Sequence, residues 1–127
     1  MIYVDTSALV KLIITEEHST EMTEYIYSPM AVSEIGAVEL RRAVRLQRPD
    51  LLTDAEHLLA RMTKVAVNRA VLQAAGGLQP ASLRTLDAIH LASAVTMGDL
   101  LDAFVSYDQR LLEAARLAGL PTASPGL

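Results

Sequence analysis

Four acidic side chains stand where a carboxylate could hold a cation: Asp5, Glu39, Asp87 and Asp108. Asp5 directly follows the apolar run Ile2–Val4, which we predict to be a short buried strand, and it precedes a helical segment. Asp108 follows the apolar run 103–105 in a similar way. Ligands of open α/β sheets bind at this carboxyl edge of the strands. The structural alternative is a helix N-cap, and each Asp taken alone would be interpreted as one.

Glu39 lies in a predicted helix over residues 34–47. At 100° per residue, Ile35 and Ala43 fall about 40° to either side of Glu39 and Leu46 about 20° away, which predicts a central place in an apolar stripe. An ionised carboxylate that faces a core is costly unless it is paired or bound to metal. We therefore favour a metal-binding or catalytic role over the structural alternatives, a slightly rotated helix or an ion pair with Arg42.

Asp87 is the only carboxylate of the segment 83–97, which is apolar almost all round and is predicted to be a buried helix. An unpaired Asp there would be strongly destabilising. The structural alternatives are an ion pair with Arg84 or a hydrogen bond to His90. We interpret both residues as supports that orient Asp87, because a lone His on a mainly apolar helix is more often a hydrogen-bonded core residue than a catalytic base.

These carboxylates would repel one another if they converged without a cation, and some of them would become protonated. Mg²⁺ removes this conflict, because it binds carboxylate oxygens, keeps several waters and binds substrate phosphates. Such a site suits phosphodiester hydrolysis, in which the metal activates water and stabilises the charge on the phosphorus and on the leaving oxygen.

The composition narrows the class of protein. With 127 residues, 51% of them hydrophobic and 20% charged, the chain suits one compact domain over residues 1–127. The absence of cysteine excludes disulfides, thiolate metal sites and cysteine nucleophiles. We find no apolar run of membrane-spanning length and no basic-then-apolar leader, so we expect a cytoplasmic protein without membrane contact.

The charge distribution bears on nucleic-acid binding. A net charge of −4 means that such binding requires a local basic patch or bridging cations, and 4% aromatic residues are too few for a base-stacking platform. Arg41, Arg45 and Arg48 cluster on the polar face of the helix over 34–47, on the side away from Glu39. Such a stripe is most often a solvated or partner-facing surface. RNA phosphates are the alternative partner, and we do not place the stripe in the site.

Strands and helices alternate along the chain. We predict strands over 2–4, 30–32, 64–67, 103–105 and 122–123, and helices over 6–14, 18–27, 34–47, 51–62, 69–76, 83–97 and 109–118. Ser33, Asp50 and Asn68 are the expected N-caps of the third, fourth and fifth helices. This alternation predicts an α/β fold, in which helices cover both faces of a mostly parallel sheet.

The segments DTSAL, VSEIGAVELRRA, LRTLDAIHLASA and AFVSYDQRLLEAARLAGL, in this order and spacing, resemble the motifs of PIN-domain ribonucleases. The match is best to the VapC-type toxins of bacterial and archaeal toxin–antitoxin operons, and it covers essentially the whole chain. The resemblance implies a three-layer α/β/α sandwich with a five-stranded, mostly parallel sheet. It implies an Mg²⁺- or Mn²⁺-dependent endonuclease that acts on RNA, commonly tRNA or rRNA, and leaves 5′-phosphate and 3′-hydroxyl ends. It further implies a homodimer and a cognate antitoxin that occludes the site.

The family's acidic quartet falls on Asp5, Glu39, Asp87 and Asp108. The hydroxyl of its first motif falls on Thr6 or Ser7, where it would hold a water at the metal or a phosphate oxygen near a helix N-terminus. Many relatives carry a further Asp where this chain has Leu111, and this departure weakens the case for a strict two-metal mechanism. The residues that we expect to support the quartet are Thr6, Ser7, Arg84, His90 and Ser106.

Two other classes of protein stay open. A receiver-like phosphoacceptor domain also gathers acids and Mg²⁺ at this edge of a sheet. It requires an Asp at the end of a central strand and a well-placed Lys, whereas the middle strands here are followed by Ser33 and Asn68 and the only lysines are Lys11 and Lys64. The second class is a PIN fold retained as a non-catalytic interaction module. The presence of the whole acidic quartet argues against it.

Overall fold

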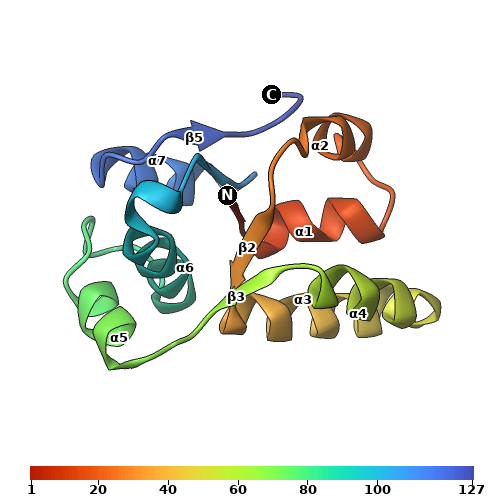
Figure 1. Cartoon of the computed structure of the whole chain (residues 1–127), viewed down its shortest axis with the longest axis horizontal. Helices are drawn as coiled ribbons and strands as arrows, with labels where there is room; N and C mark the ends of the chain where they lie inside the picture. The colour runs from red at the N-terminus through yellow and green to blue at the C-terminus, as the bar shows by residue number, and fades with distance from the viewer.

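A single sheet of five parallel strands forms the centre of the protein (Figure 1). The computed structural model describes residues 1–127. The strand order is β3-β2-β1-β4-β5, which places β1 in the middle. The strands are β1 (Ile2–Val4), β2 (Met30–Ser33), β3 (Thr63–Val65), β4 (Ala103–Val105) and β5 (Thr122–Ala123). The predicted parallel α/β sheet is confirmed, with every strand pair parallel.

Seven helices connect the strands. They are α1 (Thr6–Ile13), α2 (Ser19–Tyr25), α3 (Glu34–Gln47), α4 (Leu52–Ala60), α5 (Arg69–Gly76), α6 (Thr85–Thr96) and α7 (Gln109–Leu117). Two short 3₁₀ turns, η1 (Pro49–Leu51) and η2 (Gly98–Leu100), precede α4 and β4. No helix is both long and apolar enough to cross a membrane.

The helices cover both faces of the sheet because side chains alternate along β1. Ile2 and Val4 contribute to one core, which α1 to α4 cover. Tyr3 points to the opposite face, where it stacks on Phe104 with ring centroids 5.3 Å apart and packs under α6 and α7. Helix α5 lies outside α6 and packs on it through Val71 (Figure 1). The expected three-layer sandwich is therefore present.

Most helix starts follow the predicted capping chemistry. The Ser33 hydroxyl accepts a hydrogen bond from the Ile35 N–H, and the Asn68 side chain accepts one from the Val71 N–H. The prediction for Asp50 is wrong, because this residue lies inside η1 and its carboxylate pairs with Arg48 instead. The sixth helix begins at Thr85 instead of residue 83, which leaves Leu83 and Arg84 in the preceding loop.

Helix α3 is rotated relative to the orientation that its apolar stripe predicts. Its buried residues are Gly36, Ala37, Leu40 and Val44, whereas Leu46 is 84% exposed. Glu39 therefore lies beside the buried face of α3 and not at its centre, so the predicted central position is wrong. The structural alternative of a rotated helix is the one observed. Arg42 makes no ion pair with Glu39.

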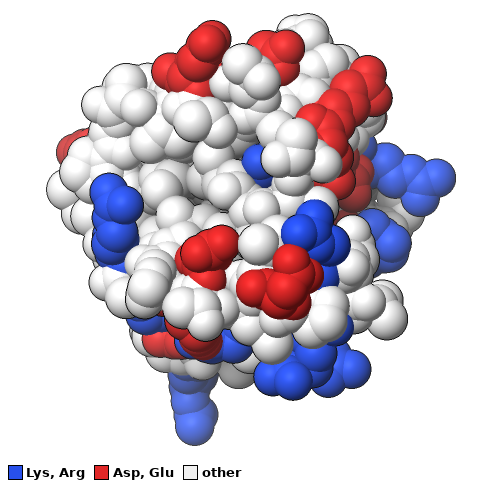
Figure 2. Space-filling model, turned by 90° about the vertical axis from the view of Figure 1, so that its right-hand side faces the viewer, with Lys and Arg blue, Asp and Glu red and all other residues white.

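The arginines on the outer face of α3 are mostly engaged by nearby acids. Arg41 donates to Glu56 of α4 over 2.6 Å, and Arg48 pairs with Asp50 over 2.8 Å. Figure 2 shows the side of the molecule on which α1 and α3 end, and acidic and basic side chains are interspersed on it. This face thus carries no continuous basic surface for an RNA backbone.

Candidate active site

The four predicted acids all lie toward one edge of the sheet. Asp5 and Asp108 are the N-caps of α1 and α7, which follow β1 and β4. Glu39 lies in the second turn of α3, which follows β2. Helix α6 leads back to β4, so it runs against the strands and begins at the same edge, with Asp87 in its first turn. The parallel topology thus gathers acids from distant segments at the carboxyl edge, where α/β proteins bind ligands.

Asp5 is buried, and its carboxylate is held by neutral groups. It accepts hydrogen bonds from the Ser7 hydroxyl over 2.6 Å, from the Ser106 hydroxyl over 2.5 Å and from the Ala8 N–H over 3.1 Å. Its side chain is thus both an N-cap and part of a wider network, because the Ser106 hydroxyl also accepts from the Asp108 N–H. Burial raises the pKa of Asp5 above its ordinary value, although these hydrogen bonds act against that rise.

Glu39 is held by a chain of hydrogen bonds that reaches into the core. Its Oε1 accepts from the Thr6 hydroxyl over 2.8 Å and from Nε2 of His90 over 2.6 Å. On the other side of the His90 ring, Nδ1 lies 2.7 Å from the Tyr3 hydroxyl, which accepts from the Ser33 N–H. All groups are satisfied when the Tyr3 O–H donates to Nδ1 and the neutral ring donates from Nε2–H to Glu39. Burial favours a raised pKa of Glu39, but the His90 and Thr6 contacts outweigh it and lower the pKa.

His90 thus supports a different acid from the one that the sequence predicted. It contacts Glu39 and Tyr3 and makes no hydrogen bond to Asp87, so the expectation that it orients Asp87 is wrong. The prediction of a hydrogen-bonded core histidine is confirmed, since His90 is only 2% exposed.

Tyr3 and Gly36 are structural members of this network that the sequence reasoning missed. A β-carbon at Gly36 would lie 2.5 Å from Cγ2 of Val32 and 2.9 Å from Cε1 of His90, so only glycine lets α3 approach the ring this closely. Two signals were available in the sequence. A glycine inside a helical pattern often marks close packing, and a tyrosine in a buried strand needs a partner for its hydroxyl.

Asp87 and Asp108 share a single cation, the guanidinium of Arg84. Its Nε lies 3.2 Å from Oδ2 of Asp87 and its Nη2 lies 3.5 Å from Oδ2 of Asp108. The ion pair between Arg84 and Asp87 that the sequence offered is present, and the second contact of Arg84, with Asp108, joins the start of α6 to the start of α7. The Arg84 side chain is 75% exposed, so this bridge lies open to solvent.

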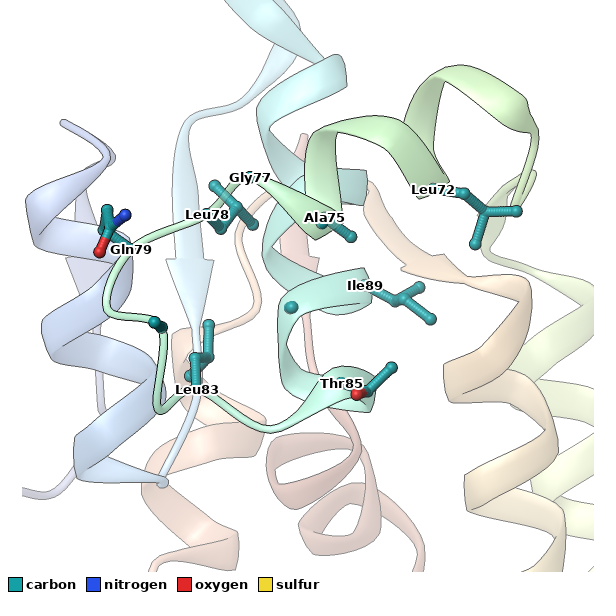
Figure 3. Close-up of a pocket in the computed structure, with 11 residues that line it drawn as sticks. Leu72, Ala75, Gly77, Leu78, Gln79, Leu83, Thr85 and Ile89 are labelled. Atoms are coloured by element: carbon teal, nitrogen blue, oxygen red, sulfur yellow. The ribbon is translucent and has the colours of Figure 1, made fainter.

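Two hollows flank this acidic edge, and a third lies apart from it. Arg84 and Asp87 line both of the first two, one of about 300 Å³ beside Glu39 and one of about 430 Å³ beside α7. The third hollow, of about 410 Å³, lies at α5, the following loop and α6, and contains apolar side chains such as Leu72 and Leu78 (Figure 3). It contains no acidic residue, whereas Glu39 and Asp87 line the first two hollows.

The donor set fits a hard divalent cation, although no three His, Asp or Glu side chains are gathered closely enough to hold one as they stand. Thr6, the residue that follows Asp5, donates to Glu39, and Arg84 pairs with both Asp87 and Asp108. All the acidic and hydroxyl groups at this edge are oxygen ligands, which Mg²⁺ and Mn²⁺ prefer. The buried carboxylate of Asp5 has only neutral hydrogen-bond partners, so a cation beside it would offset the cost of its burial.

Neither lysine of the chain pairs with the four acids, as a receiver-like phosphoacceptor would require. Lys64 donates to backbone carbonyls at the start of β3, which is the opposite edge of the sheet. Lys11 is engaged by Glu16 and by the carbonyl of Glu17. The structure therefore gives no support to the phosphoacceptor alternative.

Comparison with known proteins agrees with this architecture. The PIN domain family model matches residues 2–117. The chain is 43% identical to Ribonuclease VapC47 and 39% identical to Ribonuclease VapC35, both of Mycobacterium tuberculosis, and each alignment covers 99% of this chain and 98% of the relative. The chain therefore belongs to the PIN-domain family, and within it to the VapC-type proteins.

Solved structures share the same fold at much lower sequence identity. The crystal structure of VapC20 of Mycobacterium tuberculosis, described as a sarcin-ricin loop cleaving toxin, superposes with a TM-score of 0.77 at 14% identity and covers 98% of this chain and 100% of that one. A toxin–antitoxin complex from Klebsiella pneumoniae also gives a TM-score of 0.77, at 19% identity and 98% coverage of both chains. These similarities establish the fold.

Proposed function

We propose that this protein is a metal-dependent endoribonuclease, the toxin of a toxin–antitoxin pair, which hydrolyses RNA phosphodiester bonds. The observation that carries the proposal is the placing of Asp5, Glu39, Asp87 and Asp108 at one edge of a PIN fold. The names of the relatives support the same activity, because the matched full-length proteins are called ribonucleases.

The four carboxylates would hold the ion, directly or through water. A bound Mg²⁺ or Mn²⁺ supplies an activated water and stabilises the negative charge that develops at phosphorus. Thr6 and His90 keep Glu39 ionised, since their contacts lower its pKa. Ser7 and Ser106 fix the two oxygens of Asp5 in place. Leu111, where many relatives carry another Asp, is buried in the packing of α7, so this turn supplies no acid for a second ion.

The partners follow from the same assignment. We place the reaction in the cytoplasm, with tRNA or rRNA as the substrate. An antitoxin that covers the acidic edge would restrain the activity, in keeping with the toxin–antitoxin complexes among the structural neighbours. We also expect a homodimer, which light scattering of the purified chain would detect.

Cleavage assays test the proposal directly. The purified protein should cut tRNA or rRNA in the presence of Mg²⁺, lose the activity in EDTA and regain it with Mn²⁺. Mapped products should carry 5′-phosphate ends. Asp87→Asn should remove the activity while the circular dichroism spectrum stays that of the wild type. RNA cleavage that persists undiminished in EDTA or in Asp87→Asn would overturn the proposal, and a non-catalytic interaction module would then be favoured.

A further inference from the structure

We infer that Arg84 exchanges partners when a divalent cation binds at the acidic edge. Without metal it neutralises Asp87 and Asp108, and once a divalent cation takes over these carboxylates it binds a phosphate of the RNA backbone. The inference rests on the proposed function, because it concerns the same acidic edge. It assigns to Arg84 a contact with the RNA that forms only when the metal ion is bound.

The contacts of Arg84 show a cation that is held loosely by two acids. The distances of 3.2 Å to Asp87 and 3.5 Å to Asp108 are at the long end for hydrogen bonds between charged groups. The guanidinium is largely exposed, whereas both carboxylates are mostly covered. A divalent ion at these carboxylates carries twice the charge and would repel the guanidinium, so Arg84 is the group that moves.

The surroundings of Arg84 suit a phosphate. The hollow of about 430 Å³ beside α7 is lined by Arg84 and by Arg110, which makes no ion pair of its own. Glu113 and Asp87, a proposed metal ligand, are the opposing charges in the wall of the same hollow. Helix α6 begins at Thr85 without a side-chain cap, so its first backbone N–H groups add donors at the same place. A guanidinium fork matches phosphate oxygens well, and an acidic chain needs such local cations to hold RNA.

Metal binding alone provides the first test, with Arg84→Ala and a matched control. Arg61→Ala removes the same charge at the opposite edge of the sheet, where Arg61 makes no ion pair. In calorimetric titrations with Mn²⁺ and no RNA, Arg84→Ala should bind the ion about two- to fivefold more tightly, because a competing cation is gone. Arg61→Ala should match the wild type. Weaker or unchanged Mn²⁺ binding by Arg84→Ala would overturn the inference.

RNA binding provides the second test, with a fluorescently labelled single-stranded RNA 12-mer. Ca²⁺ replaces Mg²⁺ to limit hydrolysis, and a gel after each titration checks that the RNA is intact. With Ca²⁺, Arg84→Ala should bind the RNA about fivefold more weakly, and its plot of log affinity against log salt should be shallower by about one. Arg84→Lys should recover most of this slope. In EDTA, the wild type and Arg84→Ala should bind the RNA equally.

The outcomes separate this inference from the proposed function. An equal loss of RNA affinity with and without Ca²⁺ would make Arg84 an ordinary phosphate contact and would contradict the exchange. A second outcome is that the wild type cleaves RNA while the Arg84→Ala substitution changes RNA affinity no more with Ca²⁺ than in EDTA. In that case the inference fails and the ribonuclease assignment stands. If the metal-conditional effect is present and no RNA is cleaved, the exchange stands and the assignment fails.

Discussion

Nε2 of His90 lies 2.6 Å from Oε1 of Glu39 and joins a surface carboxylate to a buried tyrosine on the central strand. His90 is 2% exposed, so its ring cannot swing away without opening the packing between α3 and α6. The orientation of Glu39 is therefore set by the core of the protein. Outer partners of this kind typically fix the position of a metal-binding side chain and tune its basicity.

Removal of the Tyr3 hydroxyl should make the orientation of Glu39 less well fixed. In Tyr3→Phe, Nδ1 of His90 loses the donor that fixes the tautomer, and the Ser33 N–H loses its acceptor. We expect a loss of about 1–3 kcal/mol in the free energy of unfolding, measured in urea. We also expect about a tenfold fall in kcat for RNA cleavage with KM nearly unchanged.

Tyr27→Phe serves as the matched control for this substitution, because Tyr27 is 63% exposed and lies apart from the acids. Tyr27→Phe should leave the free energy of unfolding and the kcat for RNA cleavage at their wild-type values. A Tyr3→Phe protein with wild-type kcat and wild-type stability would show that the buried hydroxyl does not act on Glu39.

A methyl group at Gly36 should disturb the same network from the other side. Gly36→Ala places a β-carbon against Val32 and His90, so one of them has to shift. Overpacking of this kind costs about 1–3 kcal/mol of stability, and the shift of His90 should lower cleavage as well. Gly76→Ala is the matched control at the end of α5, where a β-carbon meets no atom within 4 Å. Thermal unfolding should show a lower Tm for Gly36→Ala alone. Equal Tm values for the two variants would contradict the close packing.

Asp5→Asn should stabilise the metal-free protein at neutral pH. Burial raises the pKa of Asp5 in the folded state above its ordinary value of 3.8. The charged form of this group therefore costs stability above the folded-state pKa, and the cost fades as the pH falls toward the unfolded value. In EDTA at pH 7, a gain of about 1 kcal/mol would raise the Tm by about 4 °C. The gain should shrink as the pH falls through the raised folded-state pKa, because the wild-type side chain then becomes protonated in the folded protein.

Asp54→Asn is the control for the pH experiment, because Asp54 is exposed on α4 and makes no ion pair. Its Tm should follow that of the wild type at every pH. If Asp5→Asn lowers the Tm at pH 7 in EDTA, then its charged carboxylate is favourable in the fold, and our description of this buried group is wrong.

The alternation of short apolar runs with helical segments was enough to predict the parallel sheet and its two helical layers. It also predicted the edge on which Asp5 and Asp108 lie, because topology fixes where parallel strands end. The rotation of α3 could not be predicted, since Leu46 is as apolar as a core residue and only the tertiary packing exposes it. The partner of His90 was missed for the same reason. Its ring reaches Glu39 through space opened by Gly36, a contact between residues far apart in the sequence.

A calorimetric Mn²⁺ titration tests most directly whether carboxylates from four separate segments act on one ion. The wild type should bind Mn²⁺, and the four single variants Asp5→Asn, Glu39→Gln, Asp87→Asn and Asp108→Asn should each bind it more weakly, with folds intact by circular dichroism. Metal binding typically falls about 10- to 100-fold when a ligand or its support is lost. Undiminished Mn²⁺ affinity in these variants, or in a protein that carries all four substitutions, would contradict the site that we propose.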